Sequence, residues 1–322
     1  MALDFDSFFE ETLKERLQPL ERRRKMRRMA LRLFPVLLFV VIGTVYSFVW
    51  MRVLLWWEFW VLSVLIGGFL AAVFWFFFAE KSLPDEVEET LQNSLPEFLG
   101  REFRVKGRLV HYKKFVASQL FNHKTQHYDG ENSFEAEMPM MQIEFSELRA
   151  GGPAKDGWRD VFWGIFFVAE SAMWQFPTPI LIVPNRARQG FQHTGDAILA
   201  HQYHEEEEEL VQISTGVKRH YAVYAGEDKI ARGLLSDEFI DTLNEMGKEY
   251  PARVALRDGK MYVAIHLGHN WLQPDLHHSL TNPDNLRHYY EVAALGIKLC
   301  KSMSMGGAEI PGMENLPELD DV

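Results

Sequence analysis

The sequence LFPVLLFVVIGTVYSFVWM, residues 33–51, contains no charged side chain, and FWVLSVLIGGFLAAVFWFFFA follows at residues 59–79. As a helix, each apolar run would cover roughly 30 Å, which is the thickness of the hydrocarbon core of a bilayer. The connection between them carries Arg52, Trp56 and Glu58, which suit a headgroup region. The sequence therefore predicts a two-helix transmembrane hairpin over residues 33–79.

A basic cluster precedes the first apolar run. Its members are Arg22, Arg23, Arg24, Lys25, Arg27, Arg28 and Arg32. Such clusters beside a first span stay on the cytoplasmic side, and a second span returns the chain to that side. We therefore expect both termini to be cytoplasmic. The cluster is interpreted as a topology signal in contact with the membrane surface, and binding of a specific anionic lipid is the alternative. The predicted contacts are Arg22, Arg23, Arg24, Arg27 and Arg28.

Composition indicates a folded, acidic body behind this anchor. The chain has 322 residues, of which 47% are hydrophobic and 13% aromatic, and about 240 residues follow the second run. That length is enough for one or two packed domains. Residues 1–32 carry 9 Lys/Arg against 6 Asp/Glu, whereas the remainder carries 25 against 39. This acidic remainder argues against nucleic-acid binding, which requires cations that neutralise phosphates.

Periodicity predicts an α+β fold after the hairpin: a mainly antiparallel sheet domain with packed helices. Residues 1–32 form an amphipathic and basic segment, and residues 80–301 a cytoplasmic domain, with two subdomains dividing near residues 185–209 as an option. Residues 302–322 are expected to be a flexible acidic tail. The predicted strands are 134–138, 141–145, 161–169, 179–183, 210–213, 220–224, 253–256 and 261–267, and the last two are expected to form a hairpin across Asp258-Gly259. Helices are expected to start near Ser82, with Val87, Leu91 and Leu95 on one face, near Ser236, with an end at Gly247, and near Asn282.

Several short motifs, in this order after two apolar runs, resemble a bacterial family known as domain of unknown function 3137. They are Ser118–Phe121, Tyr128–Asn132, Glu144–Leu148, Phe162–Phe167 and Tyr221–Tyr224. The resemblance extends from about Arg28 to Leu267. It implies a protein of the bacterial inner membrane with a cytoplasmic domain, and it implies neither a catalytic residue nor a cofactor.

Two histidine-containing segments could hold a metal. On a helix, His201 and His204 would share a face with Glu208 one turn later. His266 and His269 begin a second group that continues to His277 and His278. Solvated loop residues are the simpler interpretation of both segments, because five consecutive acids follow His204 and spacing does not bring the second group together.

Other chemistry lacks a pattern in this chain. Tyr128–Asn132 is expected to be a hairpin turn rather than a calcium loop, and Cys300 a buried helix residue. The aromatic segment from Trp158 to Phe176 is expected in the core, with a lipid pocket as the alternative. The sequence contains no phosphate-binding Gly-Lys-Ser/Thr loop, Gly-x-Ser-x-Gly elbow or Cys-x-x-Cys pair.

These observations favour a membrane-anchored interaction or scaffold module that is not an enzyme and needs no cofactor. The expected partners are the lipid bilayer and a protein partner or a second copy. The alternative is a membrane-associated, metal-dependent enzyme or ligand sensor that uses the histidine and glutamate clusters between residues 193 and 278.

Overall fold

The computed structural model describes residues 4–50, 61, 64, 66–68, 82–121, 125–154, 157–176, 178–184, 211–213, 221–226 and 228–306. Contacts divide the chain into two compact units. The sheet unit contains Leu95–Leu272 and the chain from His288 onward, and the helical unit contains Asp4–Ser94 and Gln273–Arg287. The two units are described separately below.

Within the described residues the sheet unit has one nine-stranded sheet of order β1-β2-β3-β4-β9-β8-β5-β7-β6. Every neighbouring pair is antiparallel, which confirms the expected mainly antiparallel α+β fold. The strands are β1 (Phe103–Lys106), β2 (His127–Met138), β3 (Met141–Ala154), β4 (Gly157–Glu170), β5 (Ile180–Pro184), β6 (Val211–Ile213), β7 (Tyr221–Ala225), β8 (Ala252–Arg257) and β9 (Lys260–His266).

The predicted hairpin across Asp258 and Gly259 is confirmed. β8 and β9 pair up to Arg257 opposite Lys260, and the two turn residues have φ of 51° and 70°. Two consecutive positive φ angles define the tight turn whose twist matches that of the flanking strands, and the Asp-Gly dipeptide favours it.

β4 is the central strand that its uncharged sequence predicts. It pairs with β3 on one side and β9 on the other, and its residues from 164 to 169 are all buried. Because successive side chains of a strand point to opposite faces, Phe166 and Phe167 lie on different faces of the sheet. Each face therefore needs its own cover.

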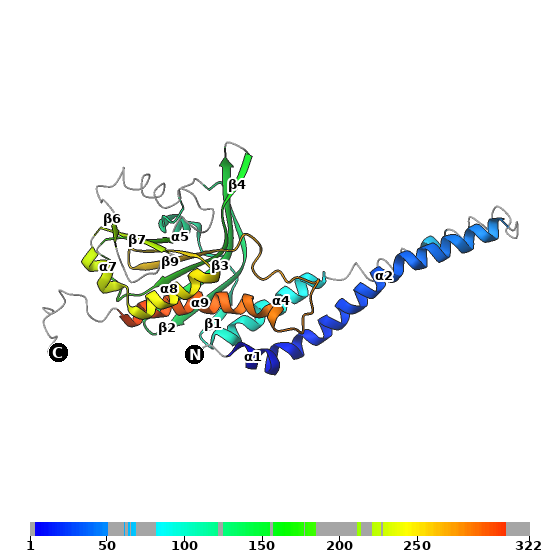
Figure 1. Ribbon diagram of the computed structural model, residues 1–322, viewed down its shortest axis with the longest axis horizontal. Coiled ribbons are helices and arrows are strands. Elements are labelled where there is room, and N and C mark those ends of the chain that lie inside the picture. The colour runs from blue at the N-terminus through cyan, green and yellow to red at the C-terminus, as the bar shows by residue number, and fades with distance from the viewer. Residues whose placement is uncertain are drawn as a thin grey trace. The chain divides into compact units, whose positions relative to one another are not determined.

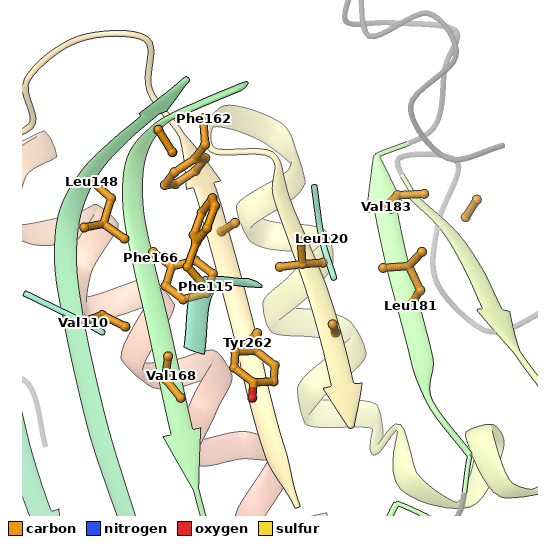
Figure 2. Packing of buried hydrophobic residues seen from close by; sticks show 14 residues of the cluster. Val110, Phe115, Leu120, Leu148, Phe162, Phe166, Val168, Leu181, Val183 and Tyr262 are labelled. Atoms are coloured by element: carbon orange, nitrogen blue, oxygen red, sulfur yellow. The ribbon is translucent and has the colours of Figure 1, made fainter. Parts of the chain in front are cut away.

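One face carries α5 (Tyr112–Ala117). The ring of Phe115 lies 5.3 Å from Phe166 and 6.1 Å from Phe162, and Figure 2 shows these rings pointing toward one another within a cluster of buried apolar residues. The cluster continues across the sheet to Tyr262 and Leu181. The aromatic segment therefore contributes core residues, as expected.

The other face carries α8 (Asp237–Glu249) and α9 (Asp284–Gly306), which run along the sheet (Figure 1). A Cβ at Gly296 of α9 would lie 2.4 Å from the ring of Phe167, so only glycine permits this close approach. Ser236 caps α8 as predicted, its hydroxyl accepting from the Phe239 amide. The predicted end at Gly247 is wrong, because the bond from the Tyr250 amide to the Met246 carbonyl, at 2.7 Å, still continues the helix.

Three further sequence expectations need correction. Tyr128–Asn132 is not a turn, because it lies inside β2. The register of β2 with β3 shifts between Glu131 and Ser133, and this irregularity permits the positive φ of 50° at Asn132. Residues 185–209 do not separate two subdomains, because β5 before them pairs with β7 and β8 after them. The final helix continues to Gly306, beyond the expected start of the tail at residue 302. Residues 307–322 lie outside the described residues.

The helical unit begins with α1 (Phe5–Phe8), the π-helical turn η1 (Phe9–Leu13) and α2 (Lys14–Trp50). The expected amphipathic stripe is confirmed, because Phe5, Phe9, Leu13 and Leu17 are buried. On α4 (Leu83–Leu99), the predicted face is also buried. In the part of the chain that the structure describes, no helix has both the length and the apolar character required to cross a membrane. Most of the second apolar run is outside that part, and the transmembrane hairpin remains a prediction.

Candidate functional site

A basic hollow of about 380 Å³ lies on the surface of α2, immediately before the first apolar run. Its lining residues are Arg24, Lys25, Arg28, Met29, Arg32 and Leu33. Residues four apart on a helix are neighbours on one face, so Arg24, Arg28 and Arg32 form a row. This row concentrates positive charge on one side of the helix.

The row starts from a buried ion pair between Arg24 and Glu21. The guanidinium donates from both Nε and Nη2 to the two carboxylate oxygens of Glu21, each at 2.7 Å, and the two residues are 6% and 4% exposed. The Leu280 amide and the Ser279 hydroxyl also donate to this carboxylate, at 3.0 and 3.2 Å. Burial alone would raise the pKa of Glu21, but the bonds from Arg24, Leu280 and Ser279 lower it to about 2. The pair is therefore charged at every physiological pH.

The carbonyl of Leu276 joins two members of the row. It accepts from Nη1 of Arg24 at 3.1 Å and from Nη2 of Arg28 at 2.9 Å. The segment Gln273–Arg287 is therefore tied to α2 inside the helical unit. Arg287 adds a bond to Asp6, at 2.6 Å. These bonds fix the orientation of the Arg24 and Arg28 side chains.

The predicted surface arginines thus have different environments. Arg24 and Arg28 line the hollow, whereas Arg23 is paired with Glu86 at 2.8 Å. Arg22 is exposed and Arg27 is half-buried, and neither lines the hollow. The hollow instead includes Lys25 and Arg32, which the prediction omitted. Their helical spacing from Arg24 and Arg28 is the signal that could have identified them.

A second concave surface belongs to the sheet unit. It is a groove of about 970 Å³ between α8 and α9, with the end of α4 at its border. Its lining combines apolar side chains, which are Leu99, Tyr250, Ala294, Leu295 and Ile297, with charged side chains, which are Glu238, Glu245, Lys248, Glu249, Glu291, Lys298 and Lys301. Glu245 and Lys298 form an ion pair at 3.1 Å. A concave surface that combines apolar and charged side chains is compatible with binding of another protein.

A chain of alternating charges lies across β1 to β4, α5 and β9. In order it consists of Glu137, Arg104, Glu135, Lys106, Glu144, Lys114, Glu170 and Lys260. Lys114 is 2.6 Å from both Glu144 and Glu170. Burial opposes the charged form of Lys114, but these two carboxylates raise its pKa overall. A lysine held charged cannot accept a proton near neutral pH, so Lys114 does not act as a general base there.

The predicted metal ligands are not assembled by the described residues. His201, His204 and Glu208 lie outside those residues. His266, at the end of β9, is half-buried, and burial together with Arg253 lowers its pKa. His269 is exposed, with Nδ1 3.0 Å from the Leu267 carbonyl. In the ranges that the structure covers, no three His, Cys, Asp or Glu side chains form a metal-binding group.

Of two residues considered for reactivity or lipid contact, Cys300 lies in the core and Trp163 is half-buried. Cys300 is fully buried, as expected, and burial raises the pKa of its thiol to about 12. The Trp163 indole donates to the Asn270 side chain at 3.2 Å, while the Arg149 guanidinium lies 4.4 Å from its ring. Neither residue offers an obvious reactive centre.

Comparison with known proteins matches part of the chain to a family model. Residues 160–305 match the model of the family described as a protein of unknown function (DUF3137). The match contains the motifs Phe162–Phe167 and Tyr221–Tyr224 and extends through most of α9. The three earlier motifs precede it, so the family match starts later in the chain than the resemblance suggested.

A search among curated proteins found no match. Among solved structures, the chain is similar to the crystal structure of the mycobacterial trehalose monomycolate transport factor A, with 8% identity over 67% of this chain and 97% of that chain. The TM-score is 0.35, which is too low to support a functional argument. Residues 160–305 are thus the part of the chain that matches the DUF3137 family.

Proposed function

We propose that this protein is an interaction or scaffold module, not an enzyme, which is anchored in the bacterial inner membrane by residues 33–79. Both termini and the α+β domain are on the cytoplasmic side, where the domain binds a protein partner or a second copy. The observation that carries the proposal is the continuity of α2, a single helix from the buried pair at Glu21 and Arg24 to the apolar run that reaches Trp50.

The side chains of the first apolar run support anchoring. Leu33, Val36, Phe39 and Ile42 on α2 are 47%, 59%, 77% and 58% exposed. Contact of apolar surface with water is unfavourable by about 25 cal/mol per Å², and soluble proteins seldom present such surfaces in continuous rows. A bilayer removes this cost. The charged row directly before Leu33 suits the adjoining headgroup layer.

Membrane extraction tests the anchor. Membranes from cells that express the full chain are washed with alkaline carbonate, which releases peripheral proteins, and the protein is expected to stay in the pellet. Replacing Val36 and Phe39 by Lys should release it, because a charge inside a spanning helix costs up to about 2.5–3.5 kcal/mol on insertion scales, with the largest cost at the helix centre. The matched control replaces Met140 and Met173, which are exposed in the sheet unit, by Lys. Release of the unmodified chain would contradict anchoring.

A reporter fused after Val322 tests the orientation. The proposal predicts that a fusion partner requiring the cytoplasm is active and that one requiring the outside is inactive. The opposite pattern would place the α+β domain on the other side of the membrane and would reject the cytoplasmic interaction role, whatever the result of the carbonate extraction.

The groove between α8 and α9 is the proposed binding surface. Ala294 is half-buried on its apolar side, so Ala294→Arg fills the groove and adds a charge. Cross-linking in membranes followed by purification should recover a reproducible partner or a dimer with the unmodified chain, and at least about tenfold less with the variant. Met173→Arg, an exposed change outside the groove, should retain the product. Recovery of monomer only from the unmodified chain would contradict the proposal.

A further inference from the structure

We propose that the basic hollow on α2 binds the phosphate of an anionic phospholipid headgroup, with Arg28 and Arg32 as the principal donors. This inference rests on the proposed function, because it assumes that the apolar run after Arg32 enters the membrane. It adds a ligand class and a defined set of residues, whereas a topology signal requires only positive charge.

Depth along the helix selects these two arginines. An α-helix rises 1.5 Å per residue, so Arg32 lies about 1.5 Å and Arg28 about 7 Å before Leu33. The headgroup region adds roughly 5–8 Å to each side of the hydrocarbon core. Arg24, about 13 Å before Leu33, falls beyond that layer. Only the later part of the row is therefore level with the phosphates.

The ion pairs of the unit lead to the same selection. The charge of Arg24 is compensated by Glu21, and that of Arg23 by Glu86. Within the described residues, Arg28 and Arg32 form no ion pair with a carboxylate. Arg28 donates only to the neutral carbonyl of Leu276, from Nη2. A guanidinium has five donors in a planar fork that matches a phosphate, so most of the donors of Arg28 remain for a ligand.

Arg24 acts as a positioning residue in this arrangement. Its bonds to Glu21 and to the Leu276 carbonyl hold that carbonyl where it also accepts from Arg28. The Arg28 side chain is thereby ordered before any ligand arrives, which lowers the conformational entropy lost on binding. Met29 and Leu33 provide the apolar part of the hollow, beside which the glycerol and upper acyl groups of a lipid would lie.

A soluble lipid allows the site to be tested separately from the anchor. The full chain is purified in a non-ionic detergent and titrated with short-chain dihexanoyl phosphatidylglycerol at one fixed salt concentration. Dihexanoyl phosphatidylcholine and inorganic phosphate are titrated in parallel. The proposal predicts binding of phosphatidylglycerol, clearly weaker binding of phosphatidylcholine, and clearly weaker binding of inorganic phosphate.

Two variants of equal charge change localise the binding. Arg28→Gln with Arg32→Gln should weaken phosphatidylglycerol binding roughly thirtyfold, because each Lys or Arg near an anionic membrane surface contributes about fivefold. Arg22→Gln with Arg27→Gln removes the same charge outside the hollow and should change the affinity less than about threefold. Glutamine is a good helix former, so both variants should keep the helical circular dichroism of the unmodified chain.

The outcomes separate the site from the anchor. If the two double variants lose the same affinity for phosphatidylglycerol, the attraction is diffuse and the proposed site is wrong. If phosphatidylcholine binds as tightly as phosphatidylglycerol, the hollow has no preference for an anionic headgroup and the proposed site is also wrong. Equal binding of inorganic phosphate would replace the lipid by a free anion. A chain that resists carbonate but shows no preference for phosphatidylglycerol refutes only the site. A chain that prefers phosphatidylglycerol in the hollow but is released by carbonate refutes only the anchor.

Discussion

Replacing Glu21 by Gln tests how the helical unit is held together. The substitution keeps the shape of the side chain but removes its charge and turns one acceptor into a donor. At least one of the contacts from Arg24, Ser279 and Leu280 is then lost. Arg24, 6% exposed, is left as a buried charge without a full counter-charge.

Two independent estimates give the size of the effect. Removing one partner of a buried ion pair typically costs about 3–5 kcal/mol. The pKa of Glu21 falls from 4.5 to about 2 on folding, and this shift corresponds to about 3 kcal/mol of stability. Because the pKa is lowered, the contribution is complete above about pH 4.5 and is lost as the pH falls toward 2. The free energy of unfolding of Glu21→Gln should therefore not show this decrease between pH 4.5 and 2.

Amide hydrogen exchange of the full chain measures the effect locally. At neutral pH, peptides that cover residues 273–287 should exchange about a hundredfold faster in Glu21→Gln than in the unmodified protein. Glu10→Gln is the matched control, because Glu10, in the adjoining turn η1, forms an exposed pair with Lys14 of α2 at 2.6 Å. Exposed pairs contribute at most about 1 kcal/mol, so the control should change exchange less than about fivefold. Equal exchange in the two variants would refute the assigned role of Glu21.

Three further predictions concern the sheet unit. Gly296→Ala should lower stability in urea unfolding by about 1–3 kcal/mol because its Cβ meets the ring of Phe167, whereas Gly107→Ala, with open space around it, should be nearly neutral. Cys300 should not react with a thiol reagent at pH 8 in the native protein and should react after unfolding, since its thiol is buried with a pKa of about 12. Lys114→Met should lower the melting temperature at neutral pH; because the pKa of Lys114 is raised, the difference from the unmodified protein should disappear only well above pH 10.5.

Local patterns predicted most of the sheet. The uncharged run of β4, the alternation in β2 and β3 and the Asp-Gly turn before Lys260 each produced the expected element. Strand order was not predictable, because β4 pairs with β9 across almost a hundred residues and no local pattern encodes that pairing. The optional division into two subdomains near residues 185–209 was incorrect for the same reason, because local patterns do not encode which distant strands pair.

The candidate site was predicted in part. The sequence located a basic cluster before Leu33, but it did not separate the paired arginines from those that line the hollow. Glu86 compensates Arg23, and the Leu276 carbonyl binds Arg28, from positions far along the chain. The metal candidates remain predictions at His201, His204 and Glu208, and stoichiometric metal in the purified protein, lost in His201→Ala, would support them.

What the sequence by itself determined is the location of its apolar, basic and alternating segments, because hydrophobic periodicity and net charge are properties of neighbouring residues. What the tertiary structure alone decided is which of those charges are compensated. Glu21 compensates the charge of Arg24 in a buried ion pair, and Ser279 and Leu280 also donate to the Glu21 carboxylate. The charges of Arg28 and Arg32 are not compensated, because the described residues place no carboxylate beside them, and that depends on the fold of distant segments.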